Sequence, residues 1–265
     1  MGINSDLSLC DKSEFTSPPY STIFPSFTQI HRNEVVFDNI LCYNYVDSKR
    51  TDKGEMDLDA MAQVTSSPIF RFDSSILLWI QDNVRSDFLT PIMKVITHLG
   101  DKGIFWIAVT LVLLYLYKTR KLGVRCMVSM VIGLVITNLI IKNWVARVRP
   151  YELIQGLECI VEKAHDWSFP SGHTTNSLAC AWVIFRRAPK KWGVPALILA
   201  ILISLSRLYV GIHYPTDVLG GAVIGIGSAC LALWLVPKLE KKFRRQFRKF
   251  YRLGKPKQAG ESRAR

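Results

Sequence analysis

The sequence predicts an all-α protein, a polytopic membrane helix bundle with five transmembrane helices preceded by an amphipathic helical region. Two observations predict it: the apolar residues are concentrated between Ile104 and Val236, and charge is segregated at the two ends of the chain. Residues 1–70 hold ten acidic and five basic side chains, whereas residues 238–265 hold twelve basic and two acidic ones. A membrane protein with a basic cytoplasmic tail has this distribution, and a soluble nucleic-acid-binding domain does not.

Five apolar segments of helical length follow one another, at approximately 103–118, 125–142, 174–187, 193–211 and 217–236. Several are shorter than the roughly 20 residues that cross a bilayer upright. Glycines in the last segment are expected to allow close helix packing: Gly220, Gly221, Gly225 and Gly227. Residues 73–99 also have a helical pattern, but charged side chains interrupt it, so this stretch is expected to lie along the interface or to pack on the bundle. The pattern leaves open whether it contains a sixth span.

The composition divides the chain into three parts. Residues 1–71 are polar without a sustained period, and they are expected to be a poorly ordered extension or to include a mis-assigned start. Residues 72–236 are expected to form the membrane domain, and residues 237–265 a basic tail. Aromatic side chains of the tail fall on one helical face, which predicts an interfacial helix on anionic lipid.

Basic residues in the loops set the expected orientation. They gather between the first and second segments, between the third and fourth, and after Val236, in the alternation that cytoplasmic loops must show. The loops at 143–173 and 212–216 are therefore expected to face outward. The chain is predicted to be a multi-pass protein of the cell membrane with a cytoplasmic tail.

Three polar clusters interrupt the apolar pattern, and all three fall on the predicted outer side. They are KNWVARVRP (142–150), FPSGH (169–173) and SRLYVGIHYPTD (206–217). Taken singly, a basic residue at a helix end is often an interfacial anchor, and a histidine there is often structural. Together the clusters bring six ionisable side chains to one membrane face: Lys142, Arg149, His173, Arg207, His213 and Asp217.

These residue types suit phosphoryl transfer. A phosphate ester carries about two negative charges, which Arg149 and Arg207 can bind with bidentate guanidinium groups while Lys142 adds a point charge. Ser171 and Gly172 precede a predicted helix, whose first backbone N–H groups favour an anion.

The two histidines are predicted to divide the chemistry. His213 needs an orienting partner to act as a nucleophile, and Asp217, four residues on, is placed to be that partner or to cap the last helix. His173 is left as the general acid toward the leaving oxygen. No cluster of carboxylates or cysteines indicates a metal, so neither metal nor cofactor is expected. His165 and Asp166, in the same outer loop, are expected to be solvated.

The three clusters resemble the signature of the type 2 phosphatidic acid phosphatase superfamily, which includes the vanadium haloperoxidases. Its pattern, K-x6-RP, then PSGH, then SR-x5-H-x3-D, is present here in order, and the resemblance covers roughly residues 72–236. It implies that His213 becomes a phosphohistidine supported by Asp217, and that His173 protonates the leaving group. It also implies a set of phosphate-binding residues: Lys142, Arg149, Ser171, Gly172 and Arg207.

The resemblance implies a lipid phosphatase acting on a lipid mono- or diphosphate. Undecaprenyl diphosphate is the first candidate, because an outward-facing site suits a carrier lipid that is recycled on that face. Phosphatidic acid and phosphatidylglycerol phosphate are alternative substrates. A vanadate-dependent haloperoxidase and a non-catalytic membrane interaction protein are alternatives of other classes. The apolar segments argue against a haloperoxidase, and the complete set of catalytic residue types argues against a non-catalytic protein. The expected partners are the lipid substrate and membrane lipids, with no nucleic acid and no prediction of oligomeric state.

Overall fold

The computed structural model describes residues 64–252, and within them every regular element is helical. The main helices are α3 (Pro68–Asn83), α4 (Leu89–Leu99), α5 (Ile104–Tyr115), α6 (Arg120–Leu134), α9 (Gly172–Arg187), α10 (Lys190–Tyr209), α11 (Pro215–Lys242) and α12 (Arg244–Arg252). Shorter elements are η1 (Asp101–Gly103), the π-helical η2 (Val135–Ile141), α7 (Lys142–Val145) and α8 (Pro150–Leu153). The predicted fold class, a membrane helix bundle, is confirmed.

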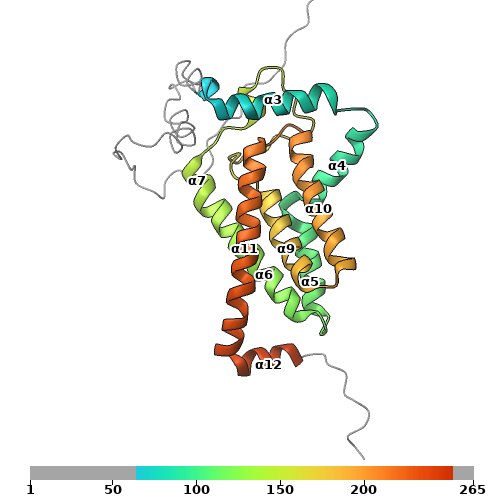
Figure 1. Ribbon diagram of the computed structural model, residues 1–265, viewed down its shortest axis with the longest axis vertical. Coiled ribbons are helices and arrows are strands. Elements are labelled where there is room, and N and C mark those ends of the chain that lie inside the picture. The colour runs from blue at the N-terminus through green and yellow to red at the C-terminus, as the bar shows by residue number, and fades with distance from the viewer. Residues whose placement is uncertain (1–63, 253–265) are drawn as a thin grey trace, which may run out of the picture.

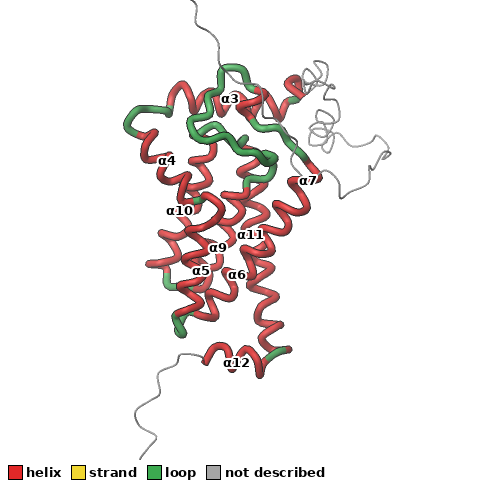
Figure 2. Tube along the Cα trace, turned by 180° about the vertical axis from the view of Figure 1, so that it is seen from behind, coloured by secondary structure: helices red, strands yellow, loops and turns green. Residues whose placement is uncertain are grey.

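Helix α9 occupies the centre of the bundle and packs against α5, α6, α10 and α11. These helices run along the long axis of the molecule, whereas α3 lies across one end and α12 across the other (Figure 1). Seen from behind, the long loops gather at the end that α3 covers (Figure 2). The chain therefore has one loop-rich end, where the sequence clusters meet, and one end closed by a basic helix.

Each predicted apolar segment contains a helix of the bundle, but the helices differ in their capacity to cross a membrane. Among the described residues, three are long and apolar enough by themselves: Arg120–Leu153, which includes η2, α7 and α8, then Lys190–Tyr209 and Pro215–Lys242. A fourth span results if α4 and α5, bent by 45° at η1, are counted as one. Helix α9 has 16 residues, a length of about 24 Å, less than the hydrocarbon core. The structure therefore does not establish the predicted count of five spans.

The amphipathic region forms two helices, α3 and α4, rather than one. Helix α3 begins at Pro68, before the predicted domain start at residue 72, because the Ser67 hydroxyl accepts a hydrogen bond from the backbone N–H of Phe70 (3.2 Å) and caps the helix. It packs on α10 and α11, as expected for a helix lying on the bundle. The predictions for residues 1–63 and 253–265 lie outside the described residues.

Two glycines let α11 approach α9 closely, as predicted. A Cβ atom added at Gly221 or Gly225 would lie 2.7 Å from a backbone oxygen at the start of α9. Gly220 faces the ring of Phe169, whereas Gly227 faces open space and takes no part in helix packing. The contact at Gly221 fixes the first turn of α11 against the N-cap of α9, which aligns two of the three polar clusters.

The tail forms the predicted helix, α12, directly after α11. Arg120, at the start of α6, donates a hydrogen bond to the carbonyl oxygen of Phe250 (2.8 Å), and Lys121 lies 5.5 Å from the centroid of the Tyr251 ring. Its binding to anionic lipid stays a prediction.

Candidate active site

The three polar clusters meet at the loop-rich end of the bundle. Ala146 adopts a left-handed conformation (φ 45°) that ends α7, and Pro150 starts α8 with Arg149 extended before it. Ser171 is the N-cap of α9, and its backbone N–H donates to the carbonyl oxygen of Asp217 (3.1 Å). Helix ends and turns therefore supply every predicted site residue.

His213 and Asp217 lie on one turn and are both buried. The carboxylate Oδ2 of Asp217 accepts the backbone N–H of Tyr214 (2.9 Å) and the hydroxyl of Ser168 (2.5 Å), and it lies 3.4 Å from Nδ1 of His213. Asp217 is not the N-cap of α11, which is Tyr214. It stands at the third helical position, where its carboxylate forms half of a capping box and also faces the imidazole. The side-chain proton of a neutral His213 is accordingly expected on Nδ1, which leaves the lone pair on Nε2.

The other nitrogen of His213 faces a positive charge. Nε2 lies 3.4 Å from a terminal nitrogen of Arg149, which also donates to the carbonyl oxygen of Ile212 (2.9 Å). Burial lowers the pKa of His213 to about 3, and the positive charges of Arg149 and Arg207 act in the same direction. The imidazole is therefore neutral at physiological pH, which is the state that a nucleophile or a hydrogen-bond acceptor requires.

An anion already contacts two of the predicted phosphate-binding cations. The carboxylate of Asp166 pairs with the ammonium group of Lys142 and with Arg149 (2.5 Å), and its own carbonyl oxygen accepts from Nε of Arg149 (2.9 Å). Burial acts to raise the pKa of Asp166, but Lys142 and Arg149 outweigh it and lower that pKa well below its usual range. The ammonium group of Lys142 also lies close to Gly172, since a Cβ atom added at Gly172 would be 4.0 Å from Nζ of Lys142.

Asp166 is exposed to solvent as predicted, but the prediction missed its contacts with two cations of the site. Its side chain is 57% exposed, yet both carboxylate oxygens bind cations of the site. The reason is the path of the loop between α8 and α9, which folds back onto the bundle through a hydrogen bond from the N–H of Ser168 to the carbonyl oxygen of Arg147 (2.8 Å). The structure shows no such contact for His165.

His173 lies apart from the nucleophile candidate, in the first turn of α9. Its Nε2 is 2.9 Å from Oδ1 of Asp101, in the bend between α4 and α5. The other oxygen of Asp101 lies 2.8 Å from Nδ1 of His98. The third predicted phosphate-binding cation, Arg207, donates to the hydroxyl of Thr97 (2.5 Å). The bend after α4 therefore positions both His173 and Arg207.

A buried chain of charges supports Asp217 from the side of α3. Arg147 donates to Oδ1 of Asp217 (2.6 Å) and to Oδ2 of Asp73 (2.7 Å), and its guanidinium lies 3.8 Å from the centroid of the Tyr214 ring. Asp73 is fully buried, and it also accepts from the hydroxyl (2.6 Å) and the N–H (3.1 Å) of Thr216. One arginine is thus shared by two buried carboxylates, and helix α3 is tied to the turn that carries His213.

Comparison with known proteins identifies the family. The family model of the PAP2 superfamily matches residues 123–241. An undecaprenyl-diphosphatase of Sulfolobus acidocaldarius is 36% identical over 137 residues, which cover 52% of this chain and 66% of that protein. Phosphatidylglycerophosphatase B of Bacillus subtilis is 30% identical over 174 residues, which cover 61% of this chain and 80% of that protein.

The chain belongs to the PAP2 superfamily. It is accordingly a phosphoric ester hydrolase of the PAP2 type. The crystal structure of a transmembrane PAP2-type phosphatidylglycerolphosphate phosphatase from Bacillus subtilis has the same fold. Its TM-score to this chain is 0.52 at 23% sequence identity, over 79% of this chain and 98% of that one.

The PAP2 signature contains most residues of the candidate site. The residues outside its fixed positions contact and support those within it. Asp73 could have been found from the sequence, because its spacing places it with Phe70 and Leu77 on the buried face of α3. An acidic residue on a buried face needs a partner. Arg147 lies inside the first cluster but outside the fixed positions of the signature. Asp101 and Ser168 had no comparable signal. Within residues 64–252 no group of three or more His, Cys, Asp or Glu side chains is arranged to hold a metal ion.

Replacing Asp73 by Asn is expected to slow turnover by up to about 100-fold, because Arg147 loses one of its two carboxylates and Asp217 is held less firmly. The KM is expected to change little, since none of these groups reaches the phosphate site. Steady-state kinetics of the purified protein on one lipid phosphate measures both constants. Asp82→Asn, an exposed acid of the same helix, is the matched control and should behave as the wild type. Equal losses in the two variants would contradict a role for the buried chain of charges.

Replacing Asp166 by Asn is expected to tighten binding of inorganic phosphate, the common product of PAP2 phosphatases, by about three- to tenfold, because the competing carboxylate no longer neutralises Lys142 and Arg149. The inhibition constant of inorganic phosphate measures this directly. Glu162→Gln removes an exposed acid from the same loop and controls for the general change in charge. Weaker phosphate binding in Asp166→Asn would show that the carboxylate assists binding instead of competing with it.

Proposed function

We propose that the chain is a membrane lipid phosphatase that hydrolyses a lipid diphosphate, with undecaprenyl diphosphate as the first candidate, through a phosphohistidine formed on His213. The observation that carries the proposal is the pair of contacts made by this imidazole. Nδ1 faces the Asp217 carboxylate at 3.4 Å, and Nε2 faces Arg149 at the same distance. A neutral, oriented imidazole beside a guanidinium group suits attack on a bound phosphate.

In the first step the substrate phosphate replaces the Asp166 carboxylate at Lys142 and Arg149. Nε2 of His213 then forms a bond to phosphorus while the bond to the leaving oxygen breaks. His173 gives that oxygen a proton, and the charge that develops on the His213 ring is stabilised by Asp217. The products of this step are the phosphohistidine and a lipid alcohol or, from a diphosphate, a lipid monophosphate.

In the second step water attacks the phosphohistidine. His173, deprotonated by the first step, accepts the proton of the attacking water, and the bond between phosphorus and Nε2 breaks. Inorganic phosphate leaves, and both histidines return to their starting states. Each residue in this cycle acts from a position at a helix end or turn of the described site.

The choice of lipid rests on the relatives and on the expected orientation. The Sulfolobus relative is named for undecaprenyl diphosphate, and the Bacillus relative for phosphatidylglycerol phosphate. The first is preferred because the basic loops and tail favour an extracytoplasmic site, with α12 on the cytoplasmic side of the cell membrane. Phosphatidic acid and phosphatidylglycerol phosphate are the alternatives. No observation in the structure favours a haloperoxidase or a non-catalytic protein.

A phosphate-release assay of the purified full-length chain tests the proposal. The substrates are undecaprenyl diphosphate, phosphatidylglycerol phosphate and phosphatidic acid, each presented in mixed micelles with EDTA. We expect phosphate release from all three, fastest from the diphosphate, and none from His213→Ala. Fastest release from phosphatidylglycerol phosphate would reject the choice of lipid. Release that requires added Mg²⁺ would reject the mechanism, and no release from any lipid would reject the function.

A further inference from the structure

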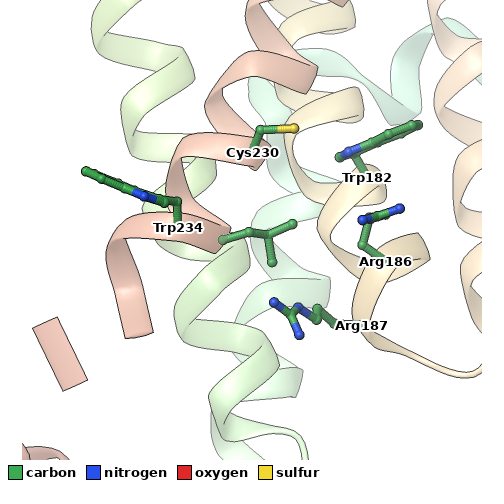
Figure 3. A pocket seen from close by; sticks show the side chains of 6 residues that line it. Trp182, Arg186, Arg187, Cys230 and Trp234 are labelled. Atoms are coloured by element: carbon green, nitrogen blue, oxygen red, sulfur yellow. The ribbon is translucent and has the colours of Figure 1, made fainter. Parts of the chain in front are cut away.

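A cavity of about 560 Å³ opens between α9 and α11, far from the active site. Six residues line it: Trp182, Arg186, Arg187, Cys230, Leu233 and Trp234. Figure 3 shows the side chains of Trp182, Arg186 and Arg187 on one side and those of Cys230 and Trp234 on the other. Arg186 and Arg187 form the last turn of α9, whose first turn carries His173. About 20 Å of helix therefore separates this cavity from the catalytic end.

The cavity combines apolar walls with unneutralised positive charge. Two indole rings, a leucine and a thiol form the walls, and two guanidinium groups stand at the end. Neither Arg186 nor Arg187 has an ion-pair partner among residues 64–252. Helix α9 contains no acidic residue, and Glu240, the acid nearest the end of α11 in the sequence, is bound by Arg125 (3.6 Å) and Tyr251 (2.6 Å). A third cation, Lys238, lies 3.4 Å from the centroid of the Trp234 ring.

A strip of open helix surface continues from the cavity along α11. Val223, Gly227, Cys230 and Trp234 follow at intervals of three or four residues, so they share one face, and all are exposed. A Cβ added at Gly227 would meet no atom within 4 Å. Gly227 thus presents no side chain between its larger neighbours on this face, and the space above it is open.

From these features we infer that the cavity is a binding site for an anionic phospholipid of the membrane leaflet opposite the active site. The phosphodiester group would contact Arg186 and Arg187, and an acyl chain would lie along the strip at Gly227. Basic residues at the end of a helix also stabilise its dipole and anchor it at the interface. Those roles do not require a cavity lined by two tryptophans, whereas basic pockets between membrane helices suit anionic head groups.

The ligand is defined by its chemistry, and it is not a substrate of the proposed reaction. Phosphatidylglycerol is the probe, because its phosphodiester lacks the terminal phosphate that the active site would hydrolyse. Phosphatidylcholine has similar chains without net charge. Glycerophosphoglycerol has the head group without the chains. The three compounds distinguish an anionic lipid from a neutral lipid and from a free anion.

Thermal unfolding of the full-length chain in detergent measures the binding. Phosphatidylglycerol is expected to raise the unfolding temperature of the wild type by about 5 °C, and the other two compounds by much less. The double variant Arg186→Gln/Arg187→Gln should lose at least half of this rise. The control variant Lys190→Gln/Lys191→Gln removes the same charge from the adjacent start of α10, outside the cavity. It should keep the full rise in unfolding temperature. Phosphatase activity without added lipid should be unchanged in both double variants.

A second variant tests the cavity independently of charge. Cys230→Trp fills the space between the two walls and should reduce the rise as much as loss of the arginines. The inference is overturned if phosphatidylcholine or glycerophosphoglycerol stabilises the wild type as strongly as phosphatidylglycerol does. It is also overturned if the two double variants lose the rise equally, or if Cys230→Trp keeps it in full.

Discussion

The buried carboxylate of Asp217 is the group on which the candidate active site depends. It has four polar neighbours: Arg147 (2.6 Å), Ser168 (2.5 Å), the N–H of Tyr214 (2.9 Å) and, more distantly, His213 (3.4 Å). A buried charge is stable only when it is compensated in this way. Each neighbour comes from a different segment of the chain, or from the turn that carries the nucleophile candidate. An unpaired buried charge would be strongly unfavourable. The contacts of Asp217 therefore keep the loop before α9, the end of α7 and the start of α11 in one arrangement.

Helix packing brings these segments within reach of each other. Gly221 places α11 against the N-cap of α9, where the N–H of Ser171 donates to the backbone oxygen of Asp217 (3.1 Å). Through Arg147 and Asp73, the same carboxylate is connected to α3, which lies outside the PAP2 signature. The helix that covers the bundle thus contributes to the orientation of His213. The predicted phosphate-binding cations make a different set of contacts, with Asp166 and Thr97.

The sequence was sufficient to predict the helix bundle and to name eight candidate site residues, because both depend on strong local signals. Apolar runs predict helices, and the spacing of Lys142, Arg149, His173 and His213 is specific to one superfamily. The supporting contacts were not predictable, since they join residues far apart in the chain. Asp101 reaches His173 only because Lys102 and Gly103 take positive φ angles that bend the chain after α4. Asp166 enters the site only because its loop folds back. The hydrophobic pattern could not predict the number of membrane spans either, because α9 is short and lies inside the bundle.

The identity of the phosphorylated residue tests the account most directly. The chain would be reacted briefly with a lipid diphosphate carrying ³²P in its terminal phosphate, quenched in alkali, and digested to locate the label. The proposed mechanism predicts an alkali-stable, acid-labile phosphate on His213 that is absent from His213→Ala. It also predicts that His173→Ala can still be labelled by an ester with a good leaving group, because such a group needs no proton. A label on His173, or one that persists in His213→Ala, would contradict the account.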